Sequence, residues 1–295
     1  MNFVFVGQNI LGGRALAGMV ARGVIPQLVV TRPPNDYANL VEQTTKEKCL
    51  RLALTSNINL DYELISQVKD LNPQVIFCCS WGQRIGPDLL RLPPLGWVNF
   101  HPSYLPAYRG PCPIEWQLIE GLNMGGCTAH FMTSKFDAGP IIKQIRVPIS
   151  EGDDGETLRH KCGEVIGEIA AECHRLLTDN PRLAGVPQDE SLASYAGPRE
   201  AARIINWGMP ARRVIDWVRG LSPYPCVLLR YEGGELCVAG VTISTIRSCG
   251  DAGRVRGHEG GLLVGTGDYY VRVTKVRVGG QVVDLGTVKP NIIPS

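Results

Sequence analysis

Short apolar runs alternate with longer amphipathic stretches through the first half of the chain. The runs are rich in Val, Ile and Phe and have the length of buried strands; they occupy residues 2–6, 27–31, 74–79 and 97–100. The stretches between them space their apolar residues as helices covering a sheet do; they occupy residues 12–22, 36–48 and 60–71. This alternation predicts an α/β fold with a doubly wound, mostly parallel sheet.

Four further elements follow before the pattern changes. Residues 113–121 begin with a proline suited to the first turn of a helix and end at a glycine. Two alternating stretches, residues 127–133 and 140–149, predict strands, and residues 154–177 form the longest amphipathic helix. We therefore predict that the first domain spans residues 1–178.

A different organisation is predicted for the rest of the chain. Residues 179–203 carry Pro, Gly, Ser and charge without a sustained period, which is typical of a linker. One helix is predicted at residues 210–220, and short strands separated by Gly-rich turns are predicted at residues 227–231, 235–243, 261–264, 269–276 and 281–285. Residues 204–295 are thus expected to form a small, OB-like β-barrel domain.

Composition and charge exclude several classes of protein. The 295 residues are 44% hydrophobic and 20% charged, which fits neither a disordered chain nor a fibrous repeat. The formal net charge of +2 gives no broad attraction for nucleic acid or an anionic membrane. There is no apolar run of about 18 residues and no secretory leader pattern, so we expect a cytoplasmic protein that makes no membrane contact.

The ten cysteines are spread along the chain without a CxxC pair. Cys78 and Cys79 are adjacent on a predicted strand, so their side chains point to opposite faces of the sheet. No His, Cys, Asp or Glu grouping has the spacing of a zinc site. We predict reduced, mostly buried thiols and no metal.

Polar residues that follow strands are the first candidates for chemistry, because ligands of open α/β sheets bind beyond the carboxyl ends of the strands. The stretch Gly7-Gln8-Asn9-Ile-Leu-Gly12-Gly13 lacks the spacing of a dinucleotide site or a phosphate-binding loop. It is compatible with an anion-binding loop or with a plain tight turn.

A second candidate lies at the end of the strand predicted at residues 97–100. Asn99 and His101 are two residues apart, so both side chains project from the same face, and an Arg109-Gly110 turn follows. Together they favour a functional site over an isolated structural histidine. Asp137 precedes Ala-Gly-Pro, which is also ordinary turn chemistry, and His130 is interpreted as a core or edge residue of its strand.

Three motifs together resemble one known family. They are Asn99-Phe-His101-Pro-Ser103, Leu105-Pro106-Ala-Tyr108-Arg109-Gly110 and Asp137-Ala-Gly139-Pro-Ile141-Ile142. The combination resembles the formyltransferases that use 10-formyltetrahydrofolate, a group that includes glycinamide ribonucleotide, methionyl-tRNA and amino-sugar formyltransferases. The resemblance spans residues 2–177, and a weaker one, Ile205-Asn-Trp207 with Ile215-Asp-Trp217-Val-Arg219, resembles the start of the C-terminal domain of the longer members. Tyr104 and Cys112 depart from the family pattern and affect the shape of the pocket more than its chemistry.

The resemblance implies a catalytic group of Asn99, His101 and Asp137. Formyl transfer to an amine passes through a tetrahedral intermediate with charge on oxygen and a proton to be removed. The Asn99 amide would donate to the formyl oxygen, and His101 would accept the amine proton or stabilise the oxyanion as imidazolium. Asp137 would favour the charged imidazole or hold a water that relays the proton.

The resemblance also implies a slot for the pterin of 10-formyltetrahydrofolate, formed by residues 80–86 and 133–139. The residues expected to contact the folate are Trp81, Gln83, Arg84, Ile85, Phe136 and Gly139. For Trp81, Arg84 and Ile85 an alternative interpretation is that they pack over the edge of the sheet without contacting folate. The family's Leu-Pro bond that matches Leu105-Pro106 is cis.

The acceptor is the open part of the prediction. Contact with it is assigned to Gln8, Asn9, Tyr108 and Arg109. The short, nearly neutral stretch at residues 31–43 lacks the basic insertion of tRNA-specific members, so we expect a small amine, such as an amino-sugar nucleotide or an amino-acid precursor, over methionyl-tRNA. A folate hydrolase or folate-binding module is a third hypothesis, against which Asn99 weighs. A homodimer is the default expectation.

Overall fold

The structure, a computed structural model, describes residues 1–33, 40–232, 234–258 and 261–285. These residues form two compact units. The first unit comprises the described residues within 1–111, 124–148 and 159–195, and the second comprises those within 112–123, 149–158 and 196–285. The predicted domain boundaries, which follow the chain in simple order, stay a prediction.

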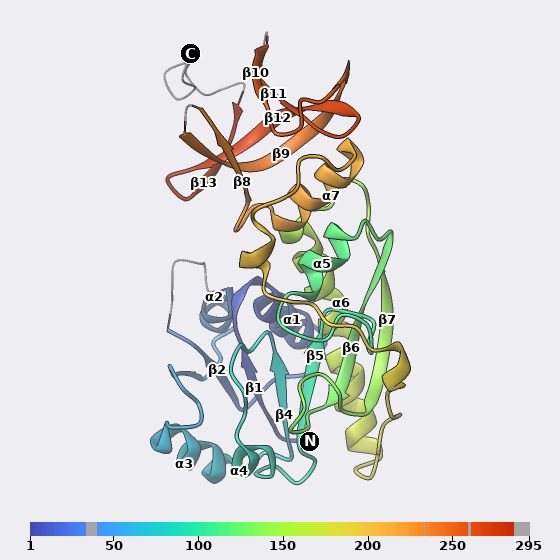
Figure 1. Ribbon diagram of the computed structural model, residues 1–295. Helices are drawn as coiled ribbons and strands as arrows, with labels where there is room; N and C mark the ends of the chain where they lie inside the picture. Colours follow the sequence, from blue (N-terminus) through green and yellow to red (C-terminus); the bar gives the residue numbers. More distant parts are fainter. Residues whose placement is uncertain (34–39, 233, 259–260, 286–295) are drawn as a thin grey trace. The chain divides into compact units, whose positions relative to one another are not determined.

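The first unit is built on a seven-stranded sheet with the order β3-β2-β1-β4-β5-β6-β7 (Figure 1). Its strands are β1 (Phe3–Gly7), β2 (Leu28–Thr31), β3 (Leu52–Leu54), β4 (Val75–Cys79), β5 (Trp97–His101), β6 (Met124–Phe131) and β7 (Ile141–Pro148). The pairs among β1 to β5 are parallel, whereas β6 pairs antiparallel with both β5 and β7. The predicted mostly parallel α/β sheet is confirmed.

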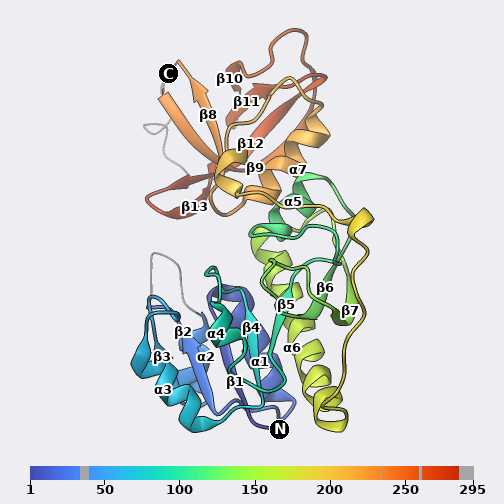
Figure 2. The same cartoon turned by 60° about the horizontal axis from the view of Figure 1, so that its bottom comes forward.

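Helices cover both faces of this sheet because successive residues of its buried strands point to opposite sides. They are α1 (Asn9–Ala21), α2 (Leu40–Glu47), α3 (Tyr62–Leu71), α4 (Pro87–Leu90) and α6 (Gly155–Asp179). Val4 and Val6 of β1 pack in one cluster with residues of α3 and α4, whereas Phe3 contacts Phe77 of β4 and His174 of α6. The helices are labelled in Figure 2. The predicted helix at residues 36–48 is present from Leu40; its first part, residues 36–39, lies outside the described residues.

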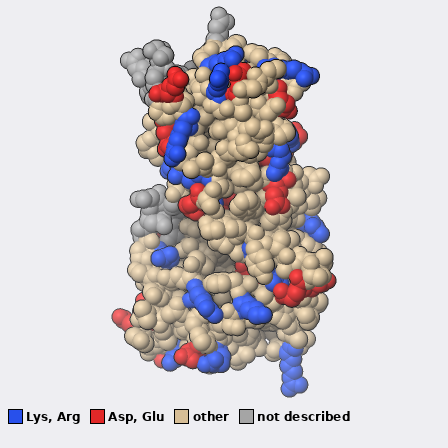
Figure 3. All heavy atoms as spheres, in the orientation of Figure 1, with Lys and Arg blue, Asp and Glu red and all other residues tan. Residues whose placement is uncertain are grey.

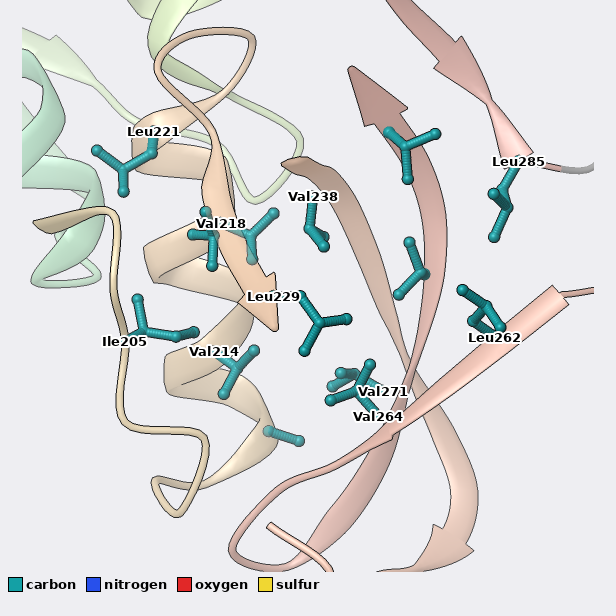
Figure 4. Packing of buried hydrophobic residues seen from close by; sticks show 14 of the residues in the cluster. Ile205, Val214, Val218, Leu221, Leu229, Val238, Leu262, Val264, Val271 and Leu285 are labelled. Atoms are coloured by element: carbon teal, nitrogen blue, oxygen red, sulfur yellow. The ribbon is translucent and has the colours of Figure 1, made fainter. Parts of the chain in front are cut away.

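The second unit contains an antiparallel sheet of six strands, in agreement with the short strands that are predicted after one helix in the C-terminal part of the chain. Its order is β10-β11-β12-β9-β8, and β13 pairs with β12. The strands are β8 (Val227–Tyr231), β9 (Gly234–Arg247), β10 (Val255–His258), β11 (Gly261–Gly265), β12 (Tyr269–Val278) and β13 (Gln281–Asp284). The helix α7 (Ala211–Leu221) contributes Val214 and Val218 to a buried cluster with Leu229, Val238 and Val271 (Figure 4).

The helix α5 (Pro113–Ile119) belongs to the second unit, although it precedes β6 in the chain. Its Trp116 ring meets Trp217 of α7 edge to face, with 6.3 Å between the ring centroids. A Cβ atom on Gly220 would lie 2.8 Å from Ile119, so the glycine permits the close approach of the two helices. Tertiary contacts therefore group α5 with residues about a hundred positions later, which a chain-order division does not anticipate.

All ten cysteines are free thiols. Cys49 and Cys249 are exposed; Cys112 and Cys237 are half-buried, and the remaining six are buried. Burial raises the pKa of the Cys78 thiol to about 12. Across the described ranges, no helix is both long and apolar enough to cross a bilayer, and no three His, Cys, Asp or Glu side chains are grouped to hold a metal ion.

Candidate active site

The register between β5 and β6 places three polar side chains at the centre of the site. Asn99 of β5 is paired directly with His130 of β6, and His101 is paired with Thr128. Residues directly opposite on antiparallel strands have neighbouring side chains. Asn99 and His101 share a face, as their spacing predicts, and His130 joins them from the next strand.

Asp137 completes this group from the loop between β6 and β7. Its Oδ1 accepts a hydrogen bond from Asn99 Nδ2 at 3.3 Å and lies 3.6 Å from His101 Nδ1 and 3.6 Å from His130 Nε2. Its Oδ2 accepts from the backbone N–H of Gly110 at 2.9 Å. The three residues that the sequence singled out are thus brought together around one carboxylate; their catalytic roles stay a prediction.

Backbone carbonyls fix the protonation of both imidazoles. His101 Nε2 donates to the Tyr108 carbonyl at 2.8 Å, because a carbonyl can only accept, and its Nδ1 faces Asp137. His130 Nδ1 donates in the same way to the Phe131 carbonyl at 2.9 Å. In the neutral ring His130 Nε2 is therefore an acceptor, and Asn99 Nδ2 lies 3.2 Å from it.

The sequence interpretation of His130 as a core or edge residue missed this contact. The ring is buried, with 2% of the residue exposed, and it lies against Asn99 and Asp137. The signal that identifies it is the antiparallel register, because period-two alternation places His130 and Thr128 on one face without saying which strand lies opposite. That information is not local in the chain.

The surroundings of Asp137 keep its carboxylate ionised. Burial alone would raise the pKa of this carboxyl. The charge of protonated His101, the hydrogen bond and charge of protonated His130 and the N–H of Gly110 outweigh burial and hold the pKa well below its usual range. The ionised carboxylate is therefore an acceptor for Asn99 and for the N–H of Gly110.

The lowered pKa of Asp137 has a consequence for stability. A carboxyl that binds protons less readily when folded stabilises the fold above its ordinary pKa, and this stabilisation is lost as the pH falls through the folded value. Each unit of depression corresponds to about 1.4 kcal/mol. We therefore expect the free energy of unfolding of the wild type to fall more steeply than that of Asp137→Asn between about pH 5 and pH 2.

Urea titrations across this pH range measure the difference. Asp88→Asn removes a carboxylate whose side chain is 97% exposed and is the matched control. Parallel curves for the wild type and Asp137→Asn would contradict the electrostatic account.

The loop after β4, residues 80–86, is braced from several sides. Arg84 donates to the Ser134 carbonyl at 3.2 Å, which joins this loop to the one that carries Asp137. Gln83 donates to the Ser56 carbonyl at 2.6 Å, and Ile85 is buried in the core cluster with Trp97. The two loops of the expected pterin slot are thus linked directly.

Two observations bear on whether this region suits a flat heterocycle. The indole Nε1 of Trp81 is a buried donor without a partner, which is uncommon for a buried polar atom. Phe136, on the adjoining loop, keeps 63% of its surface exposed. An unpaired donor and an uncovered ring fit a ligand with acceptor atoms and an aromatic face; the folate contacts predicted for Trp81, Gln83, Arg84, Ile85, Phe136 and Gly139 stay predictions.

The residues expected to contact the acceptor occupy two loops. Gln8 and Asn9 stand at the start of α1, and Asn9 has a φ of 62°. Tyr108, with a φ of 58°, presents its carbonyl to His101. Arg109 is buried, with 1% exposed, and its guanidinium already binds Gln188 and Glu190. The Leu105–Pro106 bond is cis, as the resemblance implies.

The chain matches two family models. The one described as formyl transferase matches residues 21–172, and the one described as formyl transferase, C-terminal domain, matches residues 199–286. These matches include the region of Asn99, His101 and Asp137 and most of the antiparallel sheet.

Individual proteins match over nearly the whole chain. It is 31% identical over 292 residues to the methionyl-tRNA formyltransferase of Moorella thermoacetica, covering 95% of this chain and 93% of that protein. It is 27% identical over 290 residues to the methionyl-tRNA formyltransferase of Caldanaerobacter subterraneus subsp. tengcongensis, with the same two coverages of 95% and 93%.

The fold is similar to that of a solved N-formyltransferase from Helicobacter canadensis, whose crystal structure contains folinic acid and dTDP-3-aminofucose. The TM-score is 0.67 at 13% identity, with 92% of this chain and 99% of that chain covered. The family models and the curated relatives agree with the motifs around Asn99, His101 and Asp137, and the chain belongs to the formyl transferase family.

Proposed function

We propose that the protein transfers the formyl group of 10-formyltetrahydrofolate to the amino group of methionyl-tRNA. The convergence of Asn99, His101 and Asp137 supports the reaction class, because a carboxamide donor, an imidazole and an ionised carboxylate are what the tetrahedral intermediate requires. The acceptor is supported by the relatives that match this chain from end to end.

The reaction assigns each of these groups a step. The acceptor amine attacks the formyl carbon, a carbon–nitrogen bond forms, and the electron pair of the C=O bond moves to oxygen. Asn99 donates a hydrogen bond to that oxygen, and the amine proton passes to His101, whose positive charge Asp137 stabilises. The electron pair on the oxygen then re-forms the C=O bond as the bond from the formyl carbon to the folate nitrogen breaks. This nitrogen takes the proton from His101, which returns to its first state.

The last part of the chain carries a small local excess of basic residues. Residues 200–295 contain 12 Lys and Arg against 8 Asp and Glu. Four basic residues that are exposed or half-buried lie on β9 and β12: Arg247, Arg272, Lys275 and Arg277. On the face drawn in Figure 3 basic and acidic side chains are interspersed, so any attraction for phosphate there is local rather than spread over that face.

Formylation of methionyl-tRNA by the purified protein tests the proposal. With 10-formyltetrahydrofolate as donor, we expect the aminoacyl group to gain the mass of one formyl group, and kcat/KM to fall steeply with salt. The slope of log affinity against log salt should be about 0.7–0.9 for each phosphate contacted. Lys275→Ala removes one cation, so the slope should decrease by about the contribution of one phosphate contact.

A tRNA that carries no methionine is the control for product formation. An affinity that does not change with salt, or no product from methionyl-tRNA, would reject this acceptor.

A small amine is the second candidate acceptor. Residues 31–43 carry one basic side chain, Arg32, against Asp36 and Glu42, which is not the charge expected of a segment that grips tRNA. A panel of amino-sugar nucleotides and amino acids, tested with the same donor, would reveal such an acceptor by the same mass gain. Rapid release of formate in the absence of any amine would instead favour a folate hydrolase.

A further inference from the structure

Part of the predicted linker lies against both loops of the candidate active site. We call residues 185–195 the strap; all of them belong to the first unit. Backbone bridges pair Val186 with Ile141, the first residue of β7 after the Asp137 loop, and Tyr195 with Arg109, which lies in the loop that follows β5. The N–H groups of Ile141 and Val186 donate to each other's carbonyls at 2.7 and 2.8 Å. The strap therefore has a fixed register on the catalytic loops.

The side chain of Gln188 joins the two loops. Its Nε2 donates to the carbonyls of Asp137 and Gly139, each at 2.8 Å. Its Oε1 accepts from Nε and Nη2 of Arg109 at 3.2 and 2.8 Å. Both donors and both lone-pair positions of this one carboxamide are used, so Gln188 is a complete bridge from Arg109 to the backbone of the Asp137 loop.

Arg109 is in turn held by the strap. Its Nη1 and Nη2 donate to the two carboxylate oxygens of Glu190 at 3.0 and 2.9 Å, a bidentate pair. Its backbone N–H donates to the Ser194 carbonyl at 2.9 Å, and Ser194 Oγ accepts from the N–H of Tyr108. With these partners the buried guanidinium of Arg109 is held in one orientation. It therefore also fixes the orientation of the Gln188 carboxamide.

Asp137 needs such support because its backbone is in the left-handed region, with a φ of 51°. Residues other than glycine adopt this conformation only where surrounding contacts enforce it. The N–H of Gly110 donates to the carboxylate of Asp137, whereas Gln188 Nε2 donates to the backbone carbonyl of Asp137.

We propose that Gln188 is a positioning residue for formyl transfer: through its bridge between Arg109 and the carbonyls of Asp137 and Gly139, it aims the Asp137 carboxylate at His101 and Asn99. The proposal rests on the proposed role of Asp137. It assigns a function in catalysis to the segment that composition alone describes as a linker.

Two substitutions separate the parts of this bridge. Gln188→Glu keeps an acceptor for Arg109 but removes both donors to the Asp137 loop, and Gln188→Leu removes everything. Both should lower kcat by about 10- to 100-fold, as expected for a misplaced catalytic group, with KM for the acceptor changed by less than about threefold. Leu192→Ala, at a strap side chain that is 66% exposed, is the matched control and should behave as the wild type.

A double-mutant cycle shows whether Gln188 acts through Asp137. If it does, Gln188→Glu should add little to the loss caused by Asp137→Asn, because the group it positions is already gone. Wild-type kcat in both Gln188 variants, or losses that multiply in the double variant, would overturn the proposal.

A second measurement does not depend on catalysis. Hydrogen exchange of the Gly110 amide, which donates to Asp137, should be faster in Gln188→Glu than in Leu192→Ala. Unchanged exchange overturns the positioning role. If exchange rises while Asp137→Asn retains full transfer activity, the proposed function of Asp137 fails and the structural coupling stands.

Discussion

Replacing Asn99, His101 or Asp137 singly with alanine is expected to lower kcat by about 10²–10³-fold, the typical cost of losing one oxyanion donor or one general acid–base group. The three side chains meet around Asp137 Oδ1, where Asn99 donates at 3.3 Å and His101 lies at 3.6 Å. Each substitution therefore removes a different part of one arrangement of charges. The effects on kcat should be far from additive when the substitutions are combined.

Single-turnover formylation with saturating folate measures these losses directly, and the melting temperature confirms that each variant is folded. His160→Ala and Asp88→Ala remove the same residue types outside the site and should retain wild-type turnover. Near-wild-type rates in Asn99→Ala, His101→Ala and Asp137→Ala alike would reject the assignment of this site.

Gly139→Ala should abolish most transfer although the residue itself carries no reactive group. A Cβ at this position would lie 1.7 Å from the Phe131 carbonyl oxygen and 2.9 Å from its carbon. The backbone cannot absorb that overlap in place, so the loop between β6 and β7 must shift, and Asp137 lies two residues before the clash. We expect kcat to fall by about 10²-fold or more, since a displacement of an ångström is enough to disrupt catalysis.

Gly152→Ala is the matched control, because a Cβ there meets no atom within 4 Å. Comparing kcat and thermal stability of the two variants separates loop displacement from a general cost of replacing glycine. A Gly139→Ala enzyme with normal kcat would show that the loop tolerates a shift and that the position of Asp137 is less critical than its geometry indicates.

Local pattern was enough to predict the architecture of the first unit, because each buried strand is a short apolar run and each covering helix has its own apolar stripe. The strand β3 escaped prediction since it is an edge strand of three residues, half-buried or exposed. In the second unit β10 was missed for a related reason: Val255 is half-buried and the other residues of this strand are exposed. Edge strands carry little hydrophobic signal.

The candidate site likewise contains residues that were predicted from the sequence and residues that were not. Asn99 and His101 were predicted from a period of two on one strand, and Asp137 from the combination of motifs. His130 and Gln188 were not, because their importance depends on which segments lie opposite them. His130 faces Asn99 through strand register, and Gln188 reaches Asp137 across 51 residues of chain that look like an ordinary helix and linker.

The distribution of exposed thiols allows each of the two units to be labelled with a dye. Cys49 belongs to the first unit and Cys249 to the second, and both are exposed, whereas burial keeps thiols such as Cys78 and Cys79 protonated and unreactive. Maleimide dyes should therefore attach to these two positions ahead of the buried ones. Energy transfer between the dyes would then report, in single molecules, the distance between these two positions with and without bound substrates.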